Sequence, residues 1–241
     1  MKTIYNLTGA LCLAFLLFTM QACNTSCVEG SGKEATESRN IDSFEKLDVA
    51  GGFKVVLVQD SSNKVTITGD DNIIKLIKTE NSGDKLKILT GRKSICAKTP
   101  VVITIGVRKL KEISASGAVE LSSNGKLNVG DLDFHLSGAS KINLDVTAAN
   151  INTEGSGITN LTLKGQASSH SVQFSGSGRL HAFDMVVSKY AIEATGESNC
   201  EVNVLNDLSV HATGACEVKY KGSPAKISKS ETGSLTVTKV E

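Results

Sequence analysis

The stretch from Phe134 to Val146 reads FHLSGASKINLDV, and it consists of two alternating apolar runs separated by a Ser-Gly pair. A Ser or Thr followed by Gly recurs along the second half of the chain at intervals of about 19 residues, the kind of regular spacing that marks repeat architectures. The glycines of this series are Gly117, Gly138, Gly157, Gly176, Gly196, Gly214 and Gly233. Self-similarity at a fixed period, with two strand-like runs in each unit, predicts a solenoid whose units bury their apolar faces by stacking.

Parallel stacking of successive coils, about 4.8 Å apart, is the geometry expected for these repeats. A corner glycine permits a sharp turn with positive φ, and the Ser or Thr before it can hydrogen-bond the neighbouring coil. The alternative is an antiparallel meander of hairpins that turns at each glycine. The regular period and the hydroxyl-Gly pair in every second turn favour the stacked coils.

Composition also indicates β structure. The 241 residues include 22 Gly, two Pro and no Trp, and the hydrophobic content of 40% and charged content of 21% are ordinary for a folded domain. Runs of Val, Ile and Thr between Gly, Ser, Asn and Asp are typical of short strands and turns. We therefore expect one all-β domain over residues 41–241, with less regular strands over 41–114 and regular repeats over 115–241.

Residues 1–22 are expected to be a secretory signal, because their apolar segment is shorter than the roughly 20 residues that span a bilayer. Ala22 followed by Cys23 resembles the cleavage site of a bacterial lipoprotein signal, which makes Cys23 the expected lipid acceptor. Cys27 is a weaker alternative acceptor, and an ordinary cleaved signal is the simpler alternative. The polar sequence over 23–40 predicts a flexible tether. We expect a protein anchored by lipid in the bacterial cell envelope, with the outer membrane favoured.

Three further features carry a family resemblance. They are RNIDSFEKLDVAGGFKVVLVQ over residues 39–59, TGDDN over 68–72, and the later Ser-Gly repeats. Together with the leader, they resemble the bacterial family described as the putative auto-transporter adhesin head domain, or GIN domain, from about residue 39 to the C-terminus. The resemblance implies a right-handed parallel β-helix in a secreted or envelope-attached protein, and the repeat found here would give it about 19 residues per coil. It supplies no catalytic residues.

Cys200 and Cys216 occupy equivalent places in successive repeats. Coils stacked in that register would make their side chains neighbours, either as a disulfide or as a ladder of small buried thiols. Cys27 and Cys96 are further cysteines, and an oxidising envelope permits them to pair. The spacing alone does not fix which cysteines are joined.

The other polar residues form no recognisable catalytic or metal-binding motif. The four histidines lack the close spacing of metal ligands, and His135 and His211 lie between apolar positions, which predicts that they face solvent. Asp131 and Asp133 could share a strand face, as in pectin-degrading β-helices, so a polysaccharide-degrading enzyme is the alternative from another functional class. A net charge of +1 gives no electrostatic footprint for nucleic acid. We expect no cofactor, metal or nucleic-acid partner.

Lysines are concentrated near the C-terminus: Lys219, Lys221, Lys226, Lys229 and Lys239. They would either protect the edge of the last coil from pairing or attract an anionic envelope polymer. No helix caps the final run over 235–240, which leaves open an oligomer, a partner contact or an assembly role at this end. The sequence as a whole predicts a non-enzymatic, lipid-anchored binding protein of adhesin type, whose partner is a glycan or an envelope protein surface.

Overall fold

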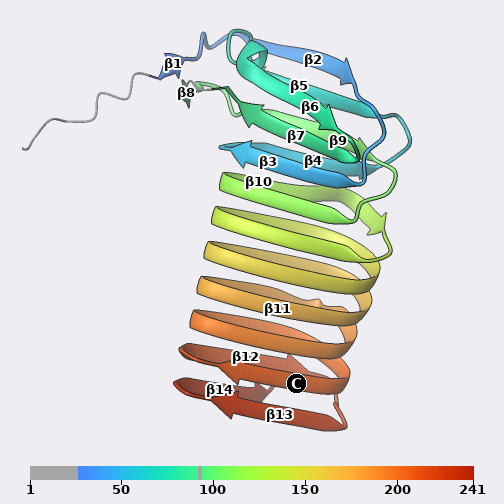
Figure 1. Ribbon diagram of the computed structural model, residues 1–241, viewed down its shortest axis with the longest axis vertical. Coiled ribbons are helices and arrows are strands. Elements are labelled where there is room, and N and C mark those ends of the chain that lie inside the picture. The colour runs from blue at the N-terminus through green and yellow to red at the C-terminus, as the bar shows by residue number, and fades with distance from the viewer. Residues whose placement is uncertain (1–26, 92–93) are drawn as a thin grey trace, which may run out of the picture.

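The structure is a computed structural model that describes residues 27–91 and 94–241, and within these residues the protein is all-β (Figure 1). The prediction of an all-β protein is thereby confirmed. The predicted signal over 1–22 and the expected lipid acceptor Cys23 lie outside the described residues. In the described part of the chain, no helix has the length and hydropathy to cross a bilayer.

The strands differ greatly in length, and β11 runs through several turns of the stack (Figure 1). The strands are β1 (Val28–Glu29), β2 (Glu34–Asn40), β3 (Lys46–Gly51), β4 (Lys54–Gln59), β5 (Lys64–Asp70), β6 (Ile77–Ser82), β7 (Lys85–Thr90), β8 (Ile95–Cys96), β9 (Val102–Val107), β10 (Glu112–Asn128), β11 (Leu132–Ala212), β12 (Ala215–Lys221), β13 (Lys226–Glu231) and β14 (Ser234–Lys239). A short 3-10 helix, η2 (Ile74–Leu76), follows β5.

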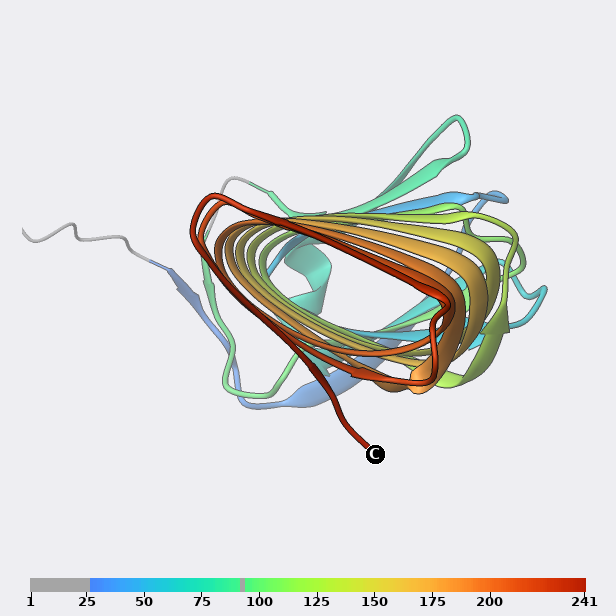
Figure 2. The same ribbon diagram turned by 90° about the horizontal axis from the view of Figure 1, so that it is seen from below.

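Successive turns of chain stack in parallel register from β10 to β14. Glu112 of β10 pairs with Asp133 of β11, Glu197 of β11 pairs with Ala215 of β12, and Ala215 pairs with Ser234 of β14. In each pair the two residues are separated along the chain by about one period of the sequence repeat, so each turn corresponds to one repeat. Figures 1 and 2 show the turns lying over one another, from the side and along the stack.

Antiparallel strands close one end of this stack. β2 pairs with β5, β5 with β9 and β6 with β7, all antiparallel, whereas β3 and β4 pair in parallel with the first turn of β10. The sheet is therefore mixed, and the prediction of a parallel solenoid does not hold for the domain as a whole. Added antiparallel strands satisfy backbone groups that an open first turn would leave unpaired. We call β2, β5, η2 and β6 the cap.

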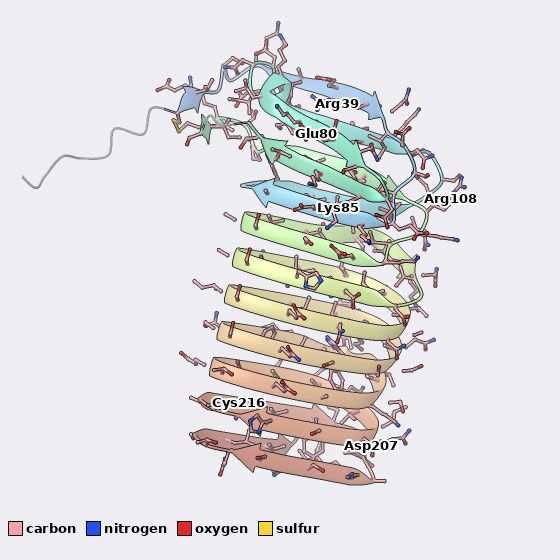
Figure 3. The ribbon with its side chains drawn as sticks, in the orientation of Figure 1. Arg39, Glu80, Lys85, Arg108, Asp207 and Cys216 are labelled. Carbon is pink, nitrogen blue, oxygen red and sulfur yellow. A yellow bond between two sulfur atoms is a disulfide. The ribbon has the colours of Figure 1, made fainter. Side chains whose placement is uncertain are left out.

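The predicted flexible tether over 23–40 is wrong for residues 27–40, because β1 and β2 lie within this segment and Cys27 is held by a disulfide. β2 pairs with β5 along its whole length, and its residues alternate between half-buried and exposed. Arg39 fixes its end by donating from Nη1 to the carbonyl oxygen of Ile77 (2.6 Å) and from Nη2 to that of Ile74 (3.1 Å), in the region labelled in Figure 3. β2 escaped prediction because an edge strand needs no apolar face.

The alternating apolar residues form the core inside the turns. In the stretch that opened the sequence analysis, Phe134, Leu136 and Ile142 are buried, while His135 and Lys141 are exposed. Burying an aliphatic or aromatic side chain contributes about 1.5–3 kcal/mol relative to leaving it exposed. The strand conformation points every second residue inward, and the stacking of turns buries these residues, so the alternating pattern favours both.

The repeated glycines lie over one another at one corner of the stack. A Cβ added at Gly138, whose φ is 78°, would lie 2.6 Å from the carbonyl oxygen of Gly117. Gly117 has the same relation to Gly51 of β3. Further positions where an added Cβ would meet the carbonyl oxygen of the preceding glycine are Gly157, Gly176, Gly196, Gly214 and Gly233. Only glycine allows the backbones of successive turns to approach this closely.

The last turn places charged residues at core positions. Lys229 and Glu231 of β13 pair with the buried residues Val210 and Ala212, and in-register parallel partners point to the same face of the sheet. Lys239 of β14 pairs in the same way with Tyr220 of β12. Charges that point inward on an edge strand oppose the addition of another strand. Of the two interpretations of the late lysines, this arrangement supports edge protection.

Replacing Lys229, Glu231 and Lys239 together with valine is expected to cause end-to-end association and a higher mass in solution, because the last turn would then offer an apolar, unpaired edge. Sedimentation equilibrium measures the change in mass. As a control, the triple replacement of Glu217, Lys219 and Lys221 by valine, one turn earlier, should leave the mass unchanged. An unchanged mass for the variant at Lys229, Glu231 and Lys239 would contradict edge protection by these charges.

Candidate functional site

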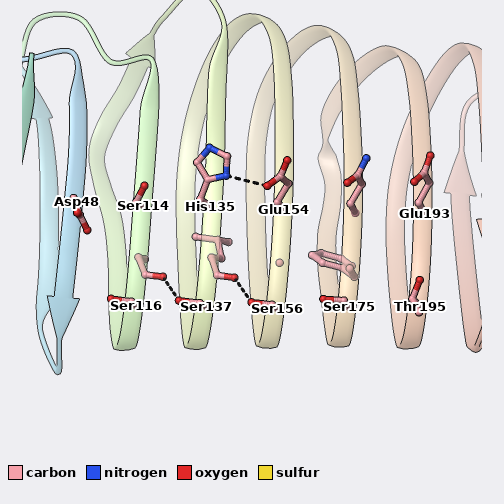
Figure 4. Close-up of a pocket in the computed structure, with 15 residues that line it drawn as sticks. Asp48, Ser114, Ser116, His135, Ser137, Glu154, Ser156, Ser175, Glu193 and Thr195 are labelled. Carbon is pink, nitrogen blue, oxygen red and sulfur yellow. Dashed lines mark hydrogen bonds and ion pairs between the residues drawn. The ribbon is translucent and has the colours of Figure 1, made fainter.

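One flank of the stack carries two columns of polar side chains that run from turn to turn. Parallel pairing puts Ser114 beside Asp48 and His135 beside Ser114. The first set, which we call the outer column, consists of Asp48, Ser114, His135, Glu154, Gln173 and Glu193. The second set, the hydroxyl column, consists of Ser116, Ser137, Ser156, Ser175 and Thr195. Figure 4 shows both columns, whose members repeat at the strand spacing of about 4.8 Å.

A groove of about 540 Å³ lies between the two columns. Its floor includes the intervening residues Leu136, Gly155 and Phe174. Phe174 is buried, and a Cβ added at Gly155 would lie 2.8 Å from its Cδ1 atom, so the aromatic ring fills the space that a larger residue at 155 would need. The groove extends along the stack from Asp48 of β3 to Glu193 of β11.

The charges in the groove are mainly negative. Asp48, Glu154 and Glu193 contribute carboxylates, and none of the described residues that line the groove is Lys or Arg. His135 Nδ1 lies 3.1 Å from the Oε2 atom of Glu154, with side-chain exposures of 47% and 61%. A pair this exposed contributes little to stability, so both groups are available to a ligand. The groove is therefore suited to neutral or cationic groups and unsuited to anionic polymers.

The hydroxyl column is weakly bonded to the protein. Ser137 Oγ donates to the carbonyl oxygen of Ala115 and Ser156 Oγ donates to that of Leu136, each at 3.4 Å. Distances near 3.4 Å are long for hydroxyl donors, which prefer about 2.7–2.8 Å. These hydroxyls can consequently exchange their present partners for those of a ligand.

The histidines and the aspartate pair noted in the sequence do not come together in one site. Of the histidines, His135 lines the groove and His211 is exposed, as predicted for both, whereas His170 is buried. Asp131 is exposed and accepts a hydrogen bond from Asn150 Nδ2 at 2.8 Å, outside the groove. Asp133, two residues later, does not line the groove either. Within the described residues, no group of three or more His, Cys, Asp or Glu side chains is arranged to hold a metal ion.

The predicted register of Cys200 and Cys216 is wrong. Cys200 pairs with Val218 and Cys216 pairs with Ser198, because the two cysteines are closer together in the chain than the residues that one turn brings into register. Both thiols are free and buried, and burial raises the pKa of Cys216 to about 11. They are core residues of neighbouring turns and do not lie in register with each other; Cys216 is labelled in Figure 3.

Cys27, the alternative lipid acceptor, forms a disulfide with Cys96. Its sulfur is therefore not free to carry a lipid.

The outer column was missed in the sequence, although a signal for it exists. Each of its members from Ser114 to Glu193 lies three residues before a corner glycine. Aligning the repeats on their glycines brings His135, Glu154 and Glu193 into one column. Single positions along one strand, such as Asp131 and Asp133, do not reveal such a column because its members come from different turns.

Comparison with known proteins agrees with this fold. A family model described as "Putative auto-transporter adhesin, head GIN domain" matches residues 43–224. A search of curated proteins finds no match to the chain.

Solved structures of similar fold include proteins from Bacteroides and Parabacteroides. A putative adhesin from Bacteroides fragilis NCTC 9343 has a TM-score of 0.83 and 22% identity, covering 88% of this chain and 100% of that chain. A putative adhesin from Parabacteroides distasonis ATCC 8503 has a TM-score of 0.67 and 20% identity over 89% and 100% of the two chains. A protein from the same strain titled a putative lipid binding protein has a TM-score of 0.62 and 20% identity over 90% and 100%. At these identities the similarity concerns the fold alone.

Proposed function

Because the chain belongs to the family described as putative auto-transporter adhesin head GIN domains, we propose that it is a non-enzymatic binding protein of the bacterial cell envelope. The observation that carries the proposal is the groove between the outer column and the hydroxyl column. We further propose that Cys23 carries the lipid anchor, with the outer membrane as the favoured location. The small residue Ala22 before this cysteine supports the assignment.

We also infer that the turns over residues 112–240 are coils of a right-handed parallel β-helix. The parallel pairing of each turn with the next supports the coil, and parallel crossover connections are almost always right-handed. A rigid β-helix holds the two columns of the groove at fixed intervals. It thereby presents hydroxyl groups from one column, and varied polar side chains from the other, at regular intervals to an extended ligand.

The ligand we propose is a neutral glycan chain that lies along the stack. Carboxylates such as Glu154 and Glu193 accept hydrogen bonds from sugar hydroxyls, and the Ser column both donates and accepts. An anionic polymer would be repelled by the carboxylates. We do not propose catalysis. The enzymatic alternative depended on Asp131 and Asp133, and these two residues do not line the groove.

Replacing Glu154 and Glu193 together with glutamine is expected to weaken glycan binding about 10-fold or more, since a hydrogen bond to a charged group contributes about 1.5–3 kcal/mol. Isothermal titration against a panel of neutral polysaccharides, with polygalacturonate as an anionic comparison, measures the affinities. The matched control is Glu201→Gln, which removes a carboxylate whose Oε2 lies 2.7 Å from His181 Nδ1 outside the groove.

Three results would contradict this function. They are the absence of binding to every neutral polysaccharide, an equal loss of affinity in the Glu201→Gln control, and the release of new reducing ends from a bound chain. The last of these would favour the polysaccharide-degrading alternative.

A further inference from the structure

The N-terminal segment of the described chain is fastened to the capped end of the stack. Cys27 is joined to Cys96 by a disulfide, with a Cα–Cα distance of 5.7 Å. The backbone N–H of Val28 donates to the carbonyl oxygen of Ser94, and that of Gly30 donates to Cys96, both at 2.9 Å. β1 and β8 thus form a small parallel sheet beside the cap.

Asp70, at the end of β5, binds the two sides of this connection together. Its Oδ1 accepts the N–H of Gly32 at 2.8 Å, and its Oδ2 accepts the N–H groups of Lys98 (2.7 Å) and Thr99 (3.1 Å). Burial alone would raise the pKa of this carboxyl group, but the backbone N–H donors outweigh it and hold the pKa below its ordinary value. A Cβ added at Gly30 would collide with the Asp70 carboxylate.

The next two residues of the TGDDN segment extend the same contact. Asn72 accepts the N–H of Ser31 at 2.9 Å and donates from Nδ2 to the carbonyl oxygen of Glu29 at 2.7 Å. Ser31 Oγ donates to Asp71 Oδ1 at 2.7 Å. We call the Cys27–Cys96 disulfide together with residues 70–72 the clamp. The clamp secures residues 27–33 by a covalent bond and by several polar contacts.

We propose that the clamp holds the capped end of the domain against the lipid bilayer. By fixing Cys27, it leaves only residues 23–27 as the link to the lipid anchor, and we call this link the leash. The proposal rests on the lipidation of Cys23 proposed above. Cys23 precedes Cys27 by four residues, so the chain between them spans at most about 14 Å. If the clamp were open, the first fixed residue would be Glu34 of β2, eleven residues from Cys23, and the reach would rise to about 40 Å.

The leash gives the domain a defined position at the membrane. β1, β8 and the cap lie at one end of the stack, and the last turn lies at the other (Figure 1). Eight stacked levels, from Gly51 to Gly233, separate the cap from the last turn by about 34 Å. The partner of the capped end is the bilayer surface, whose distance the leash limits, and the groove runs along the flank away from it.

The position can be measured on full-length protein processed by a lipidating host and reconstituted in phosphatidylcholine vesicles that carry a short-range quencher on their headgroups. Fluorophores are introduced as non-canonical residues at Ala97, beside the disulfide, or at Glu241. Quenching is expected at 97 and not at 241. In the double variant Cys27→Ser/Cys96→Ser, in which only the polar contacts of the clamp still hold residues 28–33, quenching at 97 should weaken.

A matched control separates leash length from other effects of the missing disulfide. Inserting six Gly or Ser residues before Cys27, with the disulfide intact, should abolish quenching at 97, because the insertion lengthens the chain between Cys23 and the clamp. Equal quenching at 97 and 241, or unchanged quenching after the insertion, would overturn the proposal. Failure of lipidation is distinguishable, because protein without acyl mass on Cys23 would not float with the vesicles at all.

Discussion

Replacing Gly138 with alanine is expected to lower the free energy of unfolding by about 2–5 kcal/mol. The φ of Gly138 is 78°, and an alanine in this left-handed region costs about 1–2 kcal/mol. The added Cβ would also lie 2.6 Å from the carbonyl oxygen of Gly117 and 3.0 Å from its nitrogen, so the two turns would have to separate. Forced local separation of packed groups costs about another 1–3 kcal/mol.

Two other glycines separate these contributions. Gly125 has a φ of 89° but no heavy atom within 4 Å of an added Cβ, so Gly125→Ala should cost only the conformational part. Gly130 has neither a positive φ nor a close neighbour, and Gly130→Ala should be nearly neutral. Urea unfolding of the three variants gives the comparison. Equal losses for Gly138→Ala and Gly125→Ala would mean that the close approach of the turns contributes nothing.

The repeating part of the fold was predictable because one signal was repeated in every turn. Hydroxyl-Gly pairs such as Ser137-Gly138 mark the corner, and alternating residues such as Phe134 and Leu136 mark the buried face. A small mismatch in spacing was enough to defeat finer predictions. Cys200 and Cys216 fall out of register because they are closer together in the chain than one full turn.

The cap and the groove are not encoded in a single stretch of sequence, so neither could be predicted from one repeat alone. β2, with the sequence EATESRN, is an edge strand fixed by β5 and by the Arg39 contacts, and its own sequence carries no apolar alternation. The groove combines residues such as Asp48 and Glu193 that are far apart in the chain. Their proximity depends on the register between turns, which the period alone approximates only to within one or two residues.

The core contains a histidine that the alternating pattern would assign to an apolar residue. His170 is 1% exposed, its Nε2 lies 3.0 Å from Thr153 Oγ1, and its ring centroid lies 5.2 Å from that of Tyr190. Its Nδ1 has no hydrogen-bond partner among the described residues. Burial lowers the pKa of His170 to about 3, because a charged imidazolium in this site would be stripped of water.

This histidine is expected to make the protein increasingly acid-sensitive below about pH 6.5, the ordinary pKa of histidine. The unfolded chain takes up a proton there, whereas the folded chain holds His170 neutral down to about pH 3. The stability contributed by the neutral form is complete above pH 6.5 and falls by about 1.4 kcal/mol per pH unit as the pH drops between these values. At pH 4.5 the loss should be about 3 kcal/mol.

The comparison of His170→Gln with the parent protein isolates this effect, whatever the variant's overall stability. Urea unfolding at several pH values between 4.5 and 7 gives the free energy of unfolding as a function of pH. The slope of this dependence should be smaller in His170→Gln than in the parent by about 1.4 kcal/mol per pH unit. The other titratable groups are common to both proteins and cancel in the difference. His211→Gln, which alters an exposed histidine, should keep the parental slope. Parallel profiles for the parent and His170→Gln would show that the site accepts the charged imidazole, and the uncharged core inferred at this level of the stack would have to be abandoned.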